Sequence, residues 1–444
     1  MAKRYIPARM TERRTTIPAS RLNRLTRFGG LAAGLAGNVA KHGFGELLRG
    51  NRPSLSDLLL TPTNALRLTD HLAEMRGAAL KLGQLLSMDT GDFIPRELTD
   101  ILARLRAGAD PMPDEQLLRV LKAEWGDGWQ SKLAAFDAKP IAAASIGQVH
   151  RARSRDGRAL AIKIQYPGIA QSIDSDVDNA ALLLRSTGLV PRHIDLAPLL
   201  AEAKNQLHDE ADYRREADYL GRYAALLRGE DRFALPETLP ELCSGQILAM
   251  TFQPGVPIEQ VVRQPQAQRD SIARSLMALV LRELFDFGLM QSDPNLANYR
   301  FNVATGQIVL LDFGATRIVE PPIADFYRRV LSAGLNGDQA GLRAALEGFG
   351  MLDAASSSDH TRAVLQLFEA IVEPLLKRGP FDFGDPGFLQ AMRQKGAAIA
   401  GDRRNWRLPP AEAFFVQRKI GGTYQLAARL GARVDVGKLL GQYL

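Results

Sequence analysis

The chain has 444 residues, of which 46% are hydrophobic and 24% charged, a composition that excludes a disordered protein and predicts two or three packed units. A single cysteine, Cys243, excludes an intramolecular disulfide and a thiolate-rich metal site, and it fits a reducing compartment. The six histidines show no zinc-type spacing, so a histidine-built metal site is not expected either.

The net charge of +7 belongs to the first thirty residues, which carry eight basic residues and one acidic residue. We define residues 1–55 as a basic N-terminal arm. It would contact anionic lipid or form a solvated tail, and both interpretations stay open; we expect no nucleic-acid partner. No run of about 18 apolar residues predicts a membrane span. The arginine-rich start lacks the apolar core of a secretory signal, although its composition leaves an organelle transit peptide open. We expect a cytoplasmic protein, peripheral at the inner membrane.

Helical periodicity dominates residues 56–130. Apolar residues recur there at intervals of three and four, which predicts an amphipathic helix: Leu68, Leu72, Met75, Ala79, Leu82 and Leu86. Further helical stretches follow, punctuated by prolines. We interpret this segment as an all-helical extension.

The pattern changes near Pro140. Two strand-like stretches flank an Asp156-Gly157 turn and predict a β-hairpin. A helical tract from residue 174 to 227 follows, then a strand from Gly245. A short strand pair lies further on, around the turn VATG.

This order, a small β-rich unit before a larger helical one, predicts an α+β, two-lobed protein-kinase-like fold. We place an N-lobe with inserted helices at residues 131–252 and a helical C-lobe at residues 253–444.

Lys163 lies in the apolar strand ALAIKIQ, where its charge is unfavourable unless it is paired. Read as one helix, residues 210–219 would point Glu210 and Glu216 about 240° apart, so the two could not serve one partner. Asp212 and Glu216 would share a face, and Glu216 would pair with Lys163. The alternative is an edge-strand lysine and a solvated charged helix face.

Two further motifs supply oxygen ligands. Asp293 and Asn298 are separated by four residues, as in the kinase pattern HRDxxxxN, and Asp312 opens a DFG tripeptide after an apolar run. Asp293 would orient an acceptor hydroxyl, while Asn298 and Asp312 would bind Mg²⁺. A helix-capping Asp-Pro turn is the alternative for Asp293. The order of all these motifs favours phosphoryl transfer.

A glycine-rich phosphate loop is absent from the sequence before Lys163. The corresponding position reads Ala142, Ala143, Ala144 and Ser145. Alanine carries a Cβ that narrows the backbone conformations open to glycine, so we expect this loop to hold nucleotide differently.

The motifs KLGQ at residues 81–84, AAASIGQVH, AIKIQYPG, the doubled EADY, SDPNLAN and LDFG together resemble the UbiB-like (AarF-type) atypical kinase family, in particular its mitochondrial coenzyme Q kinases. The resemblance implies that Lys163 pairs with Glu216, that Asp293 is catalytic, and that Asn298 and Asp312 bind metal. It further implies a regulatory set, in which the KxGQ extension folds over the peptide site and faces an ExD element: Lys81, Gln84, Glu210 and Asp212.

The family usually shows HADPHPGN, whereas this chain has QSDPNLAN. Gln291 and Asn295 replace histidines, and Ala297 replaces a glycine. Since Asp293 and Asn298 are retained, we expect the metal site to be retained.

The expected function is an atypical kinase or ATPase that binds ATP (or ADP) with Mg²⁺ and supports ubiquinone biosynthesis, with little peptide phosphorylation. Its partners would be nucleotide, a membrane surface or quinone-like lipid, and quinone-biosynthesis proteins. The expected nucleotide contacts are Ala142, Ala143, Ala144, Ser145, Lys163, Met250 and Phe252. Two alternatives stay open: a small-molecule kinase, and a nucleotide-sensing scaffold or lipid-binding chaperone without useful turnover.

Overall fold

The computed structural model describes residues 75, 77–79, 81, 82, 111–186, 196–353, 356–376, 379–401 and 411–443. These residues divide into two compact units. Unit 1 holds the described residues up to Gly221 and those of Glu237–Phe252, whereas unit 2 holds Arg222–Pro236 and the described residues from Gln253 onward. The basic arm, most of the helical extension and Gln84 lie outside the described residues.

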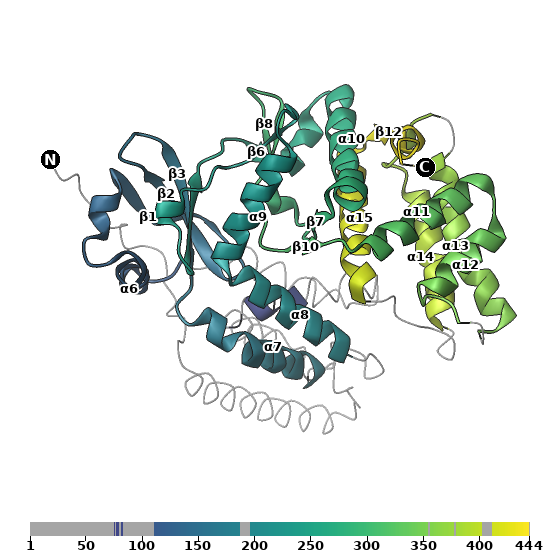
Figure 1. The fold of residues 1–444 in the computed structure, drawn as a ribbon, viewed down its shortest axis with the longest axis horizontal. Coiled ribbons are helices and arrows are strands. Elements are labelled where there is room, and N and C mark those ends of the chain that lie inside the picture. The colour runs from purple at the N-terminus through teal and green to yellow at the C-terminus, as the bar shows by residue number, and fades with distance from the viewer. Residues whose placement is uncertain are drawn as a thin grey trace, which may run out of the picture. The chain divides into compact units, whose positions relative to one another are not determined.

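Unit 1 is built on a four-stranded antiparallel sheet in the order β1-β2-β3-β5, of which Figure 1 labels β1, β2 and β3. Its strands are β1 (Ala135–Ala143), β2 (Gly147–Arg153), β3 (Ala159–Gln165) and β5 (Ile247–Thr251). Its helices are α6 (Asp114–Trp125), α7 (Ile169–Ser186), α8 (Ala197–Glu210) and α9 (Tyr213–Leu226), with 3₁₀ turns η2 (Trp129–Lys132) and η3 (Pro240–Leu242). The last turn of α9 belongs to unit 2.

The central strand β3 is buried along most of its length, because β2 and β5 pair with it on both edges. Leu160, Ile162 and Ile164 join Leu121 of α6 in one hydrophobic core. Since side chains alternate along a strand, Lys163 points to the opposite face of the sheet.

Strand β1 was not predicted as a strand of its own: the strand predicted over residues 141–154 covers only its last three residues and then β2. Strand β1 carries Asp137 and Pro140 and is exposed along most of its length, so neither alternation nor β-propensity marks it. The hairpin predicted after it is confirmed: β2 and β3 pair in antiparallel register, and Gly157 in the turn has φ +94°.

In the described part of the predicted helical tract over residues 174–227, the chain forms the three helices α7, α8 and α9. Helix α8 ends at Glu210 and α9 begins at Tyr213. The Asp212 carboxylate accepts hydrogen bonds from the N–H groups of Arg214 and Arg215, both at 3.1 Å, and so caps α9. Glu210 therefore lies on a different helix from residue 216, and our angular comparison on one helix was wrong.

The described part of unit 2 has a four-stranded sheet in the order β4-β9-β8-β6 and two-stranded sheets β7–β10 and β11–β12. The strands are β4 (Phe233–Ala234), β6 (Val256–Pro257), β7 (Leu289–Gln291), β8 (Tyr299–Asn302), β9 (Gln307–Leu310), β10 (Thr316–Ile318), β11 (Phe381–Asp382) and β12 (Arg433–Val434). The predicted β8–β9 pair is confirmed.

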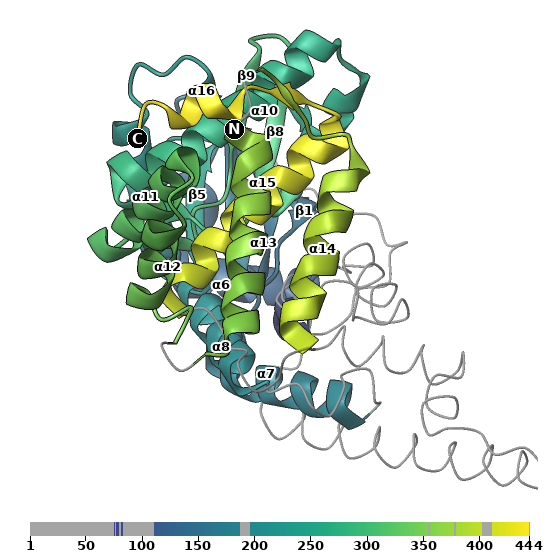
Figure 2. The same cartoon turned by 90° about the vertical axis from the view of Figure 1, so that its right-hand side faces the viewer.

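Helices make up the rest of the described part of unit 2. They are α10 (Gln266–Arg282), α11 (Pro321–Asn336), α12 (Gln339–Gly348), α13 (Ser358–Leu376), α14 (Pro386–Gly401), α15 (Ala411–Leu430) and α16 (Val436–Leu440), with 3₁₀ turns η4 (Ile258–Arg263) and η6 (Leu296–Asn298) and a π-helical segment η5 (Glu283–Phe287). Figure 2 shows α13 and α14 side by side, and the two helices are in contact.

One hydrophobic cluster of unit 2 fixes where the strand β7 lies. Val280 of α10, Leu284 of η5 and Met290 of β7 pack together with Phe415 and Val416 of α15. Because β7 leads directly into residues 292–298, this core places that loop beside α15. Within the described ranges, no helix is both long enough and apolar enough to cross a membrane.

Candidate functional site

In unit 1 the predicted Lys163–Glu216 ion pair is present. The Lys163 Nζ donates to both carboxylate oxygens of Glu216, at 3.0 and 2.8 Å. The residues are 7% and 1% exposed, and the ammonium also lies 5.0 Å from the centre of the Tyr213 ring. The pair joins the sheet to the first turns of α9, whose start Asp212 caps.

A second buried ion pair links the helical extension to Glu210 at the end of α8, a carboxylate that the loop after β1 also contacts. Lys81, 3% exposed, pairs with Glu210, and the Ser145 hydroxyl donates to the same carboxylate at 2.5 Å. The resemblance implied that the KxGQ extension faces both Glu210 and Asp212. In the structure Lys81 pairs with Glu210 at the end of α8, while Asp212 caps α9.

The alanine-rich segment forms a tight connection between β1 and β2. Ala142 and Ala143 are paired with β2, and the Ala144 N–H donates to the Gly147 carbonyl at 2.8 Å. A Cβ on Gly147 would collide with the Ile164 carbonyl oxygen and lie 2.8 Å from the Tyr213 hydroxyl. Gly147 therefore permits close approach of backbone in this loop, a role that the sequence did not single out.

The helical extension also packs closely on this loop. A Cβ on Gly77 would lie 3.0 Å from the Ser145 carbonyl oxygen and 3.1 Å from the Ile146 side chain. Gly77 thus packs on this loop, and Lys81 pairs with the Glu210 carboxylate to which Ser145 of the loop also donates.

The expected nucleotide contacts Met250 and Phe252 lie near the end of β5 and just beyond it. Met250 is buried and pairs with Ala161 in the sheet. Phe252 follows the strand, with the Arg151 guanidinium 4.1 Å above its ring centre. Their contact with nucleotide stays a prediction.

In unit 2 the DxxxxN segment, residues 293–298, forms a loop held by side-chain hydrogen bonds to its own backbone. The Asp293 carbonyl accepts from the side-chain amides of Gln291 and Asn298, at 3.0 and 3.3 Å. The Asp293 carboxylate accepts from the Asn295 N–H at 3.3 Å, and the Asn295 side chain accepts from the Ala297 N–H at 3.1 Å. Gln291 and Asn295, which replace family histidines, thus hold the loop by hydrogen bonds.

Asp312 is brought to this loop by β9. The Leu311 N–H donates to the Asn298 carbonyl at 3.1 Å, and the Asp312 carboxylate accepts from the Gly314 N–H at 3.0 Å. Asn298 and Asp312 line one cavity of about 10 Å³, close to the smallest that holds one water. Amide and carboxylate oxygens that border the same space fit a hard cation such as Mg²⁺.

The same cavity is bordered by a buried network that sequence reasoning missed. Glu283 and Lys419 are 0% and 2% exposed, and their charged groups lie 3.5 Å apart. The Tyr223 hydroxyl donates to Glu283 at 2.8 Å. The signals were weak: Glu283 ends an ordinary helical pattern, and Lys419 reads as a solvated helix lysine.

Electrostatics in this network follow from burial. Loss of water raises the pKa of Glu283, and Lys419 opposes that rise. Burial opposes the charge on Lys419, but the neighbouring Glu283 and Tyr299 outweigh it and raise the lysine pKa. Burial, reinforced by Glu283, raises the pKa of Tyr223.

Comparisons with known proteins agree with this architecture. An ABC1 atypical kinase-like domain matches residues 104–346. Atypical kinase COQ8, mitochondrial, of Saccharomyces cerevisiae is 38% identical over 438 residues, which are 97% of this chain and 86% of that protein. Atypical kinase COQ8B, mitochondrial, of Rattus norvegicus is 36% identical over 431 residues, covering 95% and 80%.

A solved structure, that of the Rv3197–erythromycin complex from Mycobacterium tuberculosis, aligns with a TM-score of 0.61 and 25% identity, covering 86% of this chain and 96% of that one. Together these matches confirm the predicted α+β kinase-like fold. The relatives' names say "mitochondrial", so they give no support to the cytoplasmic location that we expected.

Proposed function

Because the chain belongs to the ABC1 atypical kinase-like family, we propose that it is an atypical kinase or ATPase that binds Mg-ATP and supports coenzyme Q biosynthesis. The observation that carries this proposal is the buried ion pair between Lys163 and Glu216. Burying two charges is unfavourable unless their geometry is good. Kinases use such a strand lysine, held by a helix glutamate, to contact the nucleotide phosphates.

Unit 1 supplies the nucleotide-binding groups in this proposal. Lys163 contacts the phosphates while Glu216 fixes its direction. The segment of residues 142–145 covers the nucleotide with a backbone that is already closed on itself, since the Ala144 N–H is donated to Gly147. Since this N–H is already used within the protein, nucleotide binding here would depend less on backbone N–H groups than it does in a glycine-rich loop.

Unit 2 supplies the metal ligands and the catalytic aspartate. A Mg²⁺ ion held there would neutralise charge that develops on the phosphates. Asn298 donates its Nδ2 to the Asp293 carbonyl, so its Oδ1 is the atom that would face a cation, together with the Asp312 carboxylate. The Asp293 carboxylate, oriented by the Asn295 N–H, would align the acceptor hydroxyl or water.

The KxGQ extension restricts peptide phosphorylation in this account. Lys81 and Ser145 share the Glu210 carboxylate, and Gly77 packs on the Ser145 backbone. The extension is thereby bonded to the nucleotide loop through a buried charge, and a peptide that displaced it would leave Glu210 without its lysine.

The basic N-terminal arm would bring the protein to an anionic membrane surface. Its first thirty residues carry the whole net charge of +7, which attracts anionic headgroups at about 1 kcal/mol per basic residue near the surface. Access to quinone-like lipid would follow from that location.

The experiment is a Mg²⁺-dependent ATP hydrolysis assay with purified protein, with and without anionic vesicles. We expect turnover that rises with vesicles and is lost in Asp312→Asn, whereas Lys132→Ala, at an exposed lysine, keeps it. A wild-type protein that binds nucleotide but does not hydrolyse it would contradict the proposed enzymatic activity and favour the nucleotide-sensing scaffold. Phosphate transfer to a purified small metabolite would favour the small-molecule kinase.

A further inference from the structure

Helix α15 touches the loop of residues 291–299 through neighbouring positions on one face. The Arg418 guanidinium donates to the Ser292 carbonyl and to the Ser292 hydroxyl, both at 3.0 Å. The loop backbone is therefore attached to α15 immediately before Asp293.

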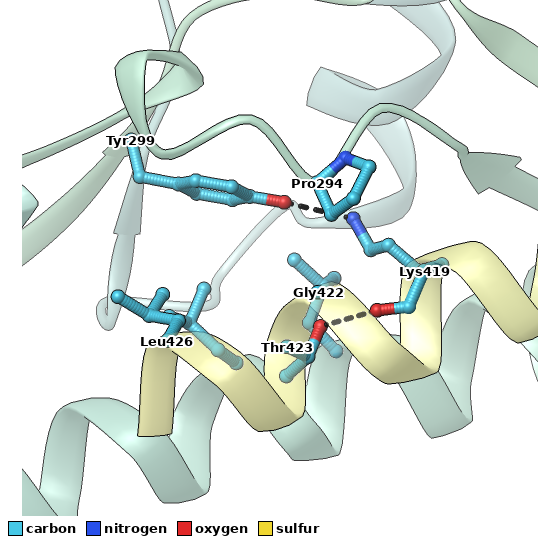
Figure 3. A pocket seen from close by; sticks show the side chains of 8 residues that line it. Pro294, Tyr299, Lys419, Gly422, Thr423 and Leu426 are labelled. Atoms are coloured by element: carbon cyan, nitrogen blue, oxygen red, sulfur yellow. Dashed lines mark hydrogen bonds between the residues drawn. The ribbon is translucent and has the colours of Figure 1, made fainter. Parts of the chain in front are cut away.

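One turn later, a glycine lets the loop approach the helix. A Cβ on Gly422 would overlap the ring of Pro294. Figure 3 shows Pro294 directly over Gly422 and Thr423 in a small pocket of about 10 Å³. Since any larger side chain would push Pro294 away, the position of the loop depends on this glycine.

Lys419 lies between these two contacts and reaches the loop from below. Its Nζ donates to the Gln291 Oε1 at 3.0 Å and to the Tyr299 hydroxyl at 2.9 Å, the two ends of the loop (Figure 3 shows the bond to Tyr299). The lysine is held in place by Glu283, whose carboxylate also accepts from the Gln291 N–H at 3.2 Å.

Gln291 passes this constraint to the catalytic aspartate. Its Oε1 accepts from Lys419 while its Nε2 donates to the Asp293 carbonyl at 3.0 Å. The amide is thus fixed at both ends, and the Asp293 backbone has a hydrogen-bonded path of two bonds to a buried charge on α15.

The network also borders the metal ligands. Glu283 and Lys419 line the same water-sized cavity as Asn298 and Asp312. The Glu283 segment is π-helical, and π-bulges inside helices are frequent at functional sites.

We propose that Lys419 is a positioning residue for phosphoryl transfer: through Gln291 it sets the placement of Asp293, with Glu283 holding the lysine. This inference rests on the proposed function. Arg418 and Gly422 serve the same end by seating Ser292 and Pro294 on α15.

The test compares variants that remove the relay without leaving a lone buried charge. Lys419→Met alone would leave Glu283 without its cation and threaten folding. Lys419→Met/Glu283→Gln removes both charges at similar volume, and Gln291→Leu removes the relay without changing charge. Lys438→Met, at an exposed lysine, is the control.

We expect kcat for ATP hydrolysis to fall about 10- to 100-fold in the double variant and in Gln291→Leu, with KM for ATP nearly unchanged. Because both act on one relay, the triple variant should be no worse than the double variant. Independent, multiplying effects, or a folded double variant with wild-type kcat, would overturn the proposal.

Hydrogen exchange of a peptide covering residues 291–299 separates this proposal from the proposed function. Faster exchange in the folded double variant supports the positioning role, and unchanged exchange overturns it. Absence of ATP hydrolysis in the wild type would contradict the proposed function. Hydrogen exchange would then still show whether Lys419 holds the loop in place.

Discussion

The Lys163–Glu216 ion pair shows how the chain stabilises a lysine in an apolar strand. The Lys163 ammonium exchanges water for two carboxylate oxygens and the face of the Tyr213 ring. Truncating only one partner of a buried pair strands the other charge, whereas replacing both by neutral groups of similar volume is often tolerated.

We therefore predict that Lys163→Met lowers the free energy of unfolding of the protein by about 3–5 kcal/mol. Lys163→Met/Glu216→Gln should recover most of that loss while remaining inactive. Urea denaturation of both variants, with Lys132→Met as the control, measures this difference. A single variant within about 1 kcal/mol of wild type would mean that the pair is solvated rather than buried.

His150 is a buried histidine whose hydrogen bonds select the neutral form. Its Nδ1 lies 2.9 Å from the Asp137 carbonyl, which can only accept, and its Nε2 lies 2.8 Å from the Gln148 amide nitrogen, which donates. Burial lowers the pKa of His150 from 6.5 to about 4.

Between pH 4 and 6.5 the unfolded chain therefore binds a proton that folded His150 does not. Stability should fall as the pH falls through this window, by up to about 3 kcal/mol. Urea denaturation at pH 7 and pH 5 should show a smaller pH dependence in His150→Asn than in wild type or in the exposed control His208→Asn. Equal pH dependence in all three would contradict the assignment.

At the scale of elements, patterns with strong local signals were predictable. The β2–β3 hairpin and the β8–β9 pair are short strand-like stretches around glycine-containing turns, and both are confirmed. Strand β1 was missed because it lies exposed at the edge of the sheet, and its sequence AFDAKPIAA shows no apolar–polar alternation. The break between α8 and α9 was missed because the helical periodicity continues across Ala211. Only the structure shows that Asp212 caps a new helix there.

The loop between β1 and β2 depends on one glycine rather than on its alanines. Gly147→Ala would push a methyl group into the Ile164 carbonyl, so we expect a loss of about 1–3 kcal/mol and weaker nucleotide binding. Gly221→Ala, in a helix with open space around it, is the matched control and should be neutral or stabilising by about 1 kcal/mol. Calorimetric unfolding of both variants, with and without nucleotide, measures their stability. Equal stability and equal nucleotide effects in Gly147→Ala and Gly221→Ala would refute the close approach at Gly147.

At the scale of the whole molecule, the motif order along the chain predicted the kinase-like fold, because each motif carries its own local signal. The buried network around Lys419 could not be predicted in this way. Its partners Glu283 and Gln291 are more than 100 residues distant in sequence, and nothing near Lys419 distinguishes it from a surface lysine. Contacts of this kind form in tertiary packing, and the hydrophobic periodicity of a sequence predicts only its local elements.

In the proposed function the chain binds Mg-ATP through Lys163. Calorimetric titration of ATP into the wild type, Lys163→Met/Glu216→Gln and the Lys132→Met control, each with and without Mg²⁺, tests this binding. We predict Mg²⁺-dependent binding in the wild type and control, and at least a tenfold weaker affinity, about 1.4 kcal/mol, in the double variant. Equal affinity in all three proteins, or no binding in the wild type, would contradict the account.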